Sequence, residues 1–96
     1  MIRHIVFFTV KQGHDIETVR EGLMMLAAIP HATHFEVGRN LQTDTITSDA
    51  PDLVVYAEFA DEAALAAFRA HPTYDACTRH VRPMRVMRMA ADFHAS

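Results

Sequence analysis

Residues 2–10, IRHIVFFTV, decide the fold, because this strand-like run carries large apolar side chains on both of its faces. Val6 and Phe8 alternate with Ile5 and Phe7, and successive side chains of a strand point to opposite faces. An antiparallel sheet in a small domain normally keeps one face polar and in contact with water. The run therefore predicts a sheet that is covered by helices on one face and by a second copy of the chain on the other.

The rest of the chain supplies further strands and helices at conventional spacings. Asp15 and Asp61 are predicted N-caps, and residues 42–52, QTDTITSDAPD, form a polar loop. We expect strands over residues 2–11, 32–41, 53–59 and 84–93, and helices from Ile16 to near Pro30, over 61–70 and over 73–81. This order is the split βαβ arrangement of ferredoxin-like α+β folds, a four-stranded antiparallel sheet with helices on one face. Two such sheets packed through their open faces would form a dimeric α+β barrel.

Strand alternation separates two sets of candidate functional residues. Val86, Arg88 and Asp92 share the alternation that we assign to the helix side of the sheet. A ligand pocket on that side is predicted to be lined by His4, Phe8, Val37, Arg39, Val55, Phe68, His71 and Tyr74. The opposite face, predicted to be the dimer interface, holds Ile5, Phe7, Val54, Tyr56, Met87 and Met89. On the remaining predicted strand, Leu41 is expected to face the same way as Val37.

Several of these residues have a possible structural role as well as a possible functional one. His4 is either a neutral core histidine or a ligand-binding group, since imidazole titrates near neutral pH. His71 precedes Pro72 and suits a helix cap, with pocket contact as the alternative. Tyr74 can point its hydroxyl into the pocket, whereas Cys77 is expected to pack in the core. Arg39 and Arg88 can bind a carboxylate or extend to the edge of the sheet.

Composition limits the classes of function. The 96 residues are expected to form one domain, residues 1–96, and half of them are hydrophobic. A net charge of −3 without a basic run argues against a nucleic-acid partner. No apolar stretch is long enough for a membrane span, and no signal peptide is expected because a strand pattern begins almost at Met1. The single cysteine fits a reducing compartment, so we expect a cytoplasmic protein.

The seven histidines raise the question of a metal site. His31 and His34 lie close in sequence but at the entrance of a predicted strand, and no HExxH or CxxC motif is present. His14 and His94 fall near a loop and the C-terminus, where solvent exposure is expected. The sequence therefore predicts no metal site, and it offers no glycine-rich phosphate loop that would indicate a nucleotide cofactor.

Three segments in order and spacing resemble a known family. They are the opening MIRHIVFF, IPHATHFEVGRNL at residues 29–41, and EFADEAALAAFRAHPTYDACTRHVRPMR at residues 58–85. Together they resemble the stress-responsive A/B barrel (Dabb) family over essentially the whole chain. The resemblance implies a homodimeric α+β barrel with a pocket between sheet and helices in each subunit. Most members have no established activity.

A plant subset of that family consists of polyketide cyclases, which close a linear poly-β-keto chain by an aldol condensation. In that subset a tyrosine ends the second helix and a histidine follows the His-Pro pair. His4 and His71 match the subset, but Phe68 stands in place of the tyrosine and Tyr74 in place of the histidine. Phenylalanine has no proton to donate, and tyrosine is a poor base near neutral pH. The resemblance thus implies the fold without the cyclase mechanism.

Three function classes remain open. The chain can be a non-catalytic dimeric barrel that binds a small hydrophobic ligand or protects under stress. It can be a cofactor-free cyclase or isomerase acting on a hydrophobic keto compound in the same pocket. It can also be a monooxygenase, cofactor-free or haem-using, of the related dimeric barrel families, although the absence of tryptophan argues against this. Fold alone does not choose among them. The first class is our leading expectation, with no cofactor.

Overall fold

The computed structural model describes all of residues 1–96 and has the predicted order of strands and helices. Two short 3₁₀ segments, Met24–Ala28 and Arg82–Met84, extend the first and third helices. The strands are β1 (Ile2–Val10), β2 (His34–Arg39), β3 (Leu53–Phe59) and β4 (Arg85–His94), and the helices are α1 (Ile16–Leu23), α2 (Glu62–Ala70) and α3 (Pro72–Val81).

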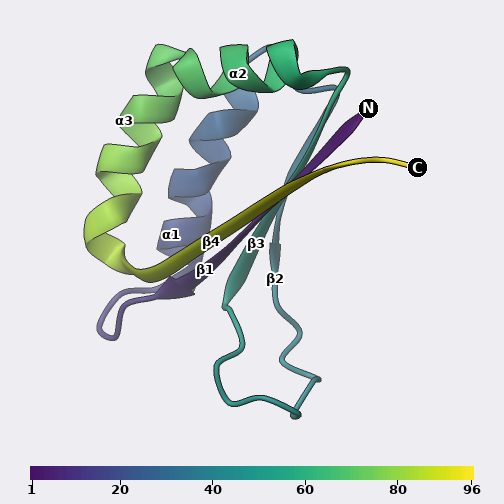
Figure 1. Cartoon of the computed structure of the whole chain (residues 1–96). Coiled ribbons are helices and arrows are strands. Elements are labelled where there is room, and N and C mark those ends of the chain that lie inside the picture. The colour runs from purple at the N-terminus through teal and green to yellow at the C-terminus, as the bar shows by residue number, and fades with distance from the viewer.

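The four strands form one antiparallel sheet in the order β2-β3-β1-β4. The three helices lie on one side of this sheet and leave its other face open, while the loop between β2 and β3 extends beyond the sheet (Figure 1). The ferredoxin-like α+β fold expected from the sequence is therefore confirmed. No helix has the length and apolar character that crossing a membrane requires.

The core lies between the sheet and the helices and follows the alternation of the two central strands. Every second residue of β1 from Ile2 to Phe8, and of β3 from Leu53 to Phe59, is buried. The helices contribute Val19, Leu23, Leu65, Phe68, Cys77 and Val81. The α1–α3 contact is close at Gly22, where a Cβ would lie 2.9 Å from the His80 ring. His4 is the one polar residue buried in this core.

Side-chain caps begin each helix as the sequence predicts. Asp15 accepts a hydrogen bond from the Thr18 amide, and Asp61 accepts one from the Ala64 amide. His71 caps α3 by accepting from the Thr73 amide through Nδ1, and Pro72 occupies the first helical position. Such caps satisfy amides that have no partner within the helix. The capping interpretation of His71 is confirmed.

The structure shortens two predicted elements. The first helix stops at Leu23 and continues as a 3₁₀ segment, and β2 covers only residues 34–39 of the predicted 32–41. Leu41, expected on the inner face of that strand, lies outside it and is 84% exposed. The chain leaves the sheet here because the Asn40 and Gln42 side chains both donate to the Pro51 carbonyl oxygen, which closes the base of the loop instead of extending the strand.

A β-bulge interrupts the pairing of β1 with β4. Thr9 lies opposite Met87, but the next residue, Val10, lies opposite Arg85, so Val86 has no partner. An extra residue on one strand reverses the alternation beyond it. Val86, predicted to face the helices, is therefore wrongly placed by simple alternation and is 65% exposed. Arg85 instead turns to the same side of the sheet as Arg88.

Candidate functional site

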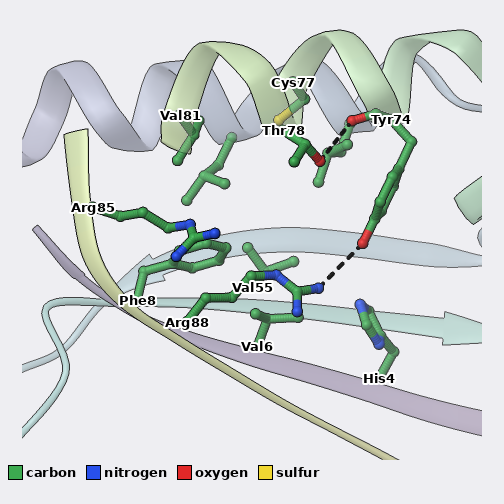
Figure 2. A pocket seen from close by; sticks show the side chains of 12 residues that line it. His4, Val6, Phe8, Val55, Tyr74, Cys77, Thr78, Val81, Arg85 and Arg88 are labelled. Carbon is green, nitrogen blue, oxygen red and sulfur yellow. Dashed lines mark hydrogen bonds between the residues drawn. The ribbon is translucent and has the colours of Figure 1, made fainter. Parts of the chain in front are cut away.

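A cavity of about 30 Å³ lies between the sheet and helices α1 and α3. Figure 2 shows Tyr74, Cys77 and Val81 on the helix above it, and the side chains of the strands below. Eight of the twelve lining residues are hydrophobic. The lining comprises His4, Val6, Phe8, Leu23, Leu26, Val55, Tyr74, Cys77, Thr78, Val81, Arg85 and Arg88. Such a volume accepts a water molecule or a small apolar group.

Half of the predicted pocket set meets at this cavity. His4 and Phe8 come from β1, Val55 from β3, and Tyr74 from the first turns of α3. Strand alternation was sufficient to find the first three, and Tyr74 was expected to point its hydroxyl into the pocket. That they bind a ligand stays a prediction.

The other four predicted pocket residues lie elsewhere. Val37 is buried in the core on β2, and two strands, β3 and β1, separate it from the β4 side of the cavity. Phe68 is 1% exposed and packs edge-on against Tyr74, with 5.6 Å between ring centroids, so it supports the lining without reaching the space. Arg39 lies 4.0 Å from Glu17 at the far edge of the sheet, and His71 is used as the cap of α3. Placing these four in the lining was wrong.

The lining residues that the sequence did not single out belong mostly to the helices. Val6 shares its strand face with His4 and Phe8, and Leu23 and Leu26 fall within the predicted first helix at the spacing of one helix face. Which part of a helix stripe borders a space depends on how the helix is placed on the sheet. Arg85 was missed for a different reason, because only the bulge at Val86 brings it to this side.

His4 is the centre of a chain of polar contacts. Its Nδ1 is hydrogen-bonded to Asp92 Oδ1, and Arg69 donates to the other oxygen of that carboxylate. An ionised carboxylate only accepts, so Nδ1 of neutral His4 carries the proton and Nε2 holds a free lone pair. Every fully buried side-chain nitrogen and oxygen has a hydrogen-bond partner, so Nε2, which has none, is not fully buried. The imidazole ring points into the hollow (Figure 2). Nε2 is therefore the basic atom offered to the cavity.

The two partners have pKa values shifted in the same direction. Desolvation lowers the pKa of His4 below 6.5 and outweighs the opposing effect of Asp92, and the charges of Arg69 and Arg88 lower it further. Desolvation raises the pKa of Asp92, but the hydrogen bonds from His4 and Arg69 outweigh it and the net shift is downward. At neutral pH the His4 imidazole is therefore neutral, and the Asp92 carboxylate beside it is ionised and paired with Arg69.

This pair predicts that acid destabilises the fold. The unfolded chain takes up a proton on His4 near pH 6.5, whereas the folded chain resists it because the folded pKa is lower. Stability is therefore full above that pH and is lost as the pH falls toward the folded pKa, at no more than about 1.4 kcal/mol per pH unit. Urea unfolding at about pH 7.5 and about pH 5 measures the loss, and His4→Gln should reduce it. An equal loss in His4→Gln would assign the effect to other groups.

Tyr74 and Arg88 form the outer wall. The Arg88 guanidinium donates to the Tyr74 hydroxyl oxygen at 3.1 Å, and the Thr78 hydroxyl donates to the Tyr74 carbonyl at 3.0 Å (Figure 2). With its oxygen accepting from Arg88, the Tyr74 hydroxyl keeps its own proton free to donate. The wall can thus supply a hydrogen-bond donor to a molecule in the cavity.

The cavity has neither a reactive thiol nor a set of metal ligands. Burial raises the pKa of the Cys77 thiol to about 11, so the thiol is protonated and unreactive at neutral pH. No three of the His, Cys, Asp and Glu side chains come together as metal ligands. The cavity offers packing, one imidazole nitrogen, hydroxyl groups and guanidinium groups.

The six residues of the predicted dimer interface lie on the open face of the sheet. Ile5 pairs with Tyr56, and Phe7 with Val54 and Met89. Arg3, Tyr56 and Glu58 make this face polar at one end, where Arg3 donates to the Tyr56 hydroxyl at 2.9 Å. Toward β4 the face is apolar, and Met89 and Phe93 are 61% and 47% exposed. Contact with a second subunit stays a prediction.

Known proteins share this architecture. The family model described as Stress responsive A/B Barrel Domain matches residues 2–95. A Dabb family protein with a ferredoxin-like fold from Mesorhizobium loti is 30% identical, with a TM-score of 0.78 over 99% of this chain and 96% of that one. A dimeric ferredoxin-like protein of unknown function from Thermobifida fusca is 26% identical, with a TM-score of 0.79 over 98% of this chain and 90% of that one.

An enzyme shares the same fold. Hydroxynitrile lyase from Passiflora edulis is 16% identical, with a TM-score of 0.78 over 96% of this chain and 90% of that one, a likeness that shows the fold alone. No curated protein matches the chain. Enzymes and dimeric proteins of unknown function thus share this architecture, and no specific activity follows from it. The chain belongs to the stress-responsive A/B barrel (Dabb) family.

Proposed function

We propose that the chain works as a homodimer in which each subunit binds a small hydrophobic compound in the cavity between sheet and helices. The observation that carries this proposal is the lining itself, which is mostly apolar with a few converging polar groups. That combination is typical of small-molecule sites. The small volume limits the part of the ligand that enters to a short apolar group.

The dimer is supported by the open face and by the neighbours. Met89 and Phe93 leave apolar surface exposed beside Ile5 and Phe7, and contiguous patches of this kind mark interaction sites. Several structural neighbours are described as dimeric. A cytoplasmic location is part of the proposal, because the lone Cys77 is free and buried, as suits a reducing compartment.

Filling part of the cavity should weaken binding. Val55→Ile adds one methylene to a lining residue that is 1% exposed, beside a space of about 30 Å³. One displaced methylene of butan-1-ol is worth about 0.8 kcal/mol, so we expect roughly fourfold weaker binding. Amide chemical shifts of the ¹⁵N-labelled chain, followed during a butan-1-ol titration, measure the dissociation constant.

Val37→Ile is the matched control, because Val37 is buried directly opposite Val55 but does not line the cavity. Its affinity for butan-1-ol should equal that of the wild type. Equal binding by Val55→Ile, with shifts centred on other residues, would contradict the proposed site.

A second candidate function is cofactor-free acid–base chemistry on a hydrophobic keto compound. The specific observation that favours it is the orientation of His4, whose Nδ1 is held by Asp92 while Nε2 is directed to the cavity. Nε2 can accept a proton from a carbon next to a carbonyl group. The Tyr74 hydroxyl, polarised by Arg88, can donate to the oxyanion that develops. The test of this candidate is catalytic turnover of such a keto compound, which His4→Ala should abolish.

A further inference from the structure

Two positive charges stand at the wall of the cavity without a negative partner. Five other arginines each lie within 4.0 Å of a carboxylate. Arg85 and Arg88 form no ion pair, although both line the cavity. Arg88 is hydrogen-bonded only to the neutral hydroxyl of Tyr74, and Arg85 makes no side-chain hydrogen bond. The guanidinium donors of both residues are thus largely free.

The carboxylate that shares the helix side of β4 with Arg88 is already in use. Asp92 lies on the same face of β4 as Arg88, but its two oxygens bind His4 and Arg69. His4 is neutral, because desolvation first and then the charges of Arg69 and Arg88 lower its pKa. The local charge at the cavity wall is therefore positive in a chain whose net charge is −3.

The arrangement of the two arginines results from the bulge. Arg85 and Arg88 are three residues apart, a spacing that places side chains on opposite faces of a regular strand. Because Val86 is unpaired, both side chains turn toward the helices, and Figure 2 shows both reaching into the hollow beside Phe8 and Val6. Bulges often direct a side chain toward a site in this way.

Guanidinium groups select among ligands that have a short apolar end. A carboxylate accepts two parallel hydrogen bonds from a guanidinium, and such charge-assisted bonds are about twice as strong as neutral ones. The oxygen of an alcohol or ketone carries no negative charge and cannot accept the two parallel bonds that a carboxylate accepts, and a protonated amine is repelled. The apolar part of the lining, which includes Leu23, Leu26 and Val81, takes up the hydrocarbon end in every case.

Resting on the proposed ligand-binding function, we propose that the ligand class is small monocarboxylates, with the carboxylate between Arg85 and Arg88 and the apolar end in the cavity. The compound enters as the anion, and no bond is made or broken on binding. Salt weakens the binding, because the two guanidinium groups lie near solvent.

The test compares butyrate with butan-1-ol and butylamine, which have the same hydrocarbon end. Titrations of the ¹⁵N-labelled full chain at neutral pH give the three dissociation constants. We expect butyrate to bind at least about tenfold more tightly than butan-1-ol, and butylamine more weakly than either. The double variant Arg85→Gln/Arg88→Gln should bind butyrate no better than butan-1-ol.

Two variants control for charge and for folding. Arg79→Gln removes a positive charge from the exposed side of α3, where Arg79 is 77% exposed and paired with Asp75, and it should leave butyrate binding unchanged. Arg85→Lys/Arg88→Lys keeps the charge without the paired donors and should restore part of the preference for butyrate.

Different failures have different meanings. Equal binding of butyrate and butan-1-ol by the wild type would overturn the carboxylate inference and leave the proposed hydrophobic site standing. Acetate binding as tightly as butyrate would also overturn it, because the cavity would then contribute nothing. Absence of binding by all four compounds would overturn the proposed function as well.

Discussion

Phe7→Asp is expected to convert the proposed dimer into monomers. Phe7 lies on the open face of the central strand β1, between Val54 of β3 and Met89 of β4. Burying a phenylalanine is worth about 1.5–3 kcal/mol, and a symmetric interface loses this contribution twice. A buried unpaired carboxylate adds a further cost. The dissociation constant should rise by at least about a thousandfold, which sedimentation measures as a halved mass.

Two further variants separate dissociation from unfolding. Met89→Asp changes a residue that is already 61% exposed in the single subunit, so the subunit should fold and still fail to dimerise. Ala63→Asp adds the same charge at an exposed position of α2, on the helix side of the sheet, and should remain dimeric. A native chain that sediments as a monomer at micromolar concentration would remove the dimer from the proposal.

The wild-type protein is expected to show no plant-type polyketide cyclase activity. Aldol closure needs a base beside the reacting carbon and a donor for the oxyanion, which are worth about 10²–10⁴-fold and about 10²–10³-fold. Phe68 and Tyr74 occupy the two positions that the resemblance marks for this work, and Phe68 is 1% exposed and closed off from the cavity by its packing. A linear tetraketide thioester assayed for cyclised product measures the activity.

The double variant Phe68→Tyr/Tyr74→His restores the pair at these positions. Its phenol would lie next to His4, whose ring centroid is 6.5 Å from that of Phe68. Activity in the double variant alone would mean that the cavity is competent and lacks only its catalytic pair. Cyclisation by the wild type that His4→Ala abolishes would favour the enzymatic candidate over the binding function. Absence of product from both proteins is the result that the binding proposal predicts.

Most of the fold could be predicted because the strongest signals are local. Large apolar residues on both faces of β1 and β3, together with Asp15 and Asp61 as caps, indicate strands and helix starts without knowledge of the tertiary structure. The end of β2 could not be predicted in this way. It depends on a contact between Asn40 and the Pro51 carbonyl, which are distant in sequence.

The site could be predicted only in part, because it depends on how elements meet. Alternation correctly placed His4, Phe8 and Val55 at the cavity, as they lie on regular, central strands. Val37 has the right alternation but lies on the edge strand β2, beyond the reach of the space. Alternation along a strand shows which face a residue lies on, but it does not show how far that strand lies from the cavity within the sheet.

The unpaired Val86 bears on how sites of this kind diverge among relatives. If Val86 paired with Val10, as in a regular strand, Arg85 would turn to the open face of the sheet and leave the cavity with a single guanidinium. A shift of one residue in the pairing of β4 with β1 beyond Thr9 therefore changes the charge that the cavity offers to a ligand, while every residue of the strand keeps its identity. Relatives are best grouped by the presence of this bulge as well as by the residues that the strand carries.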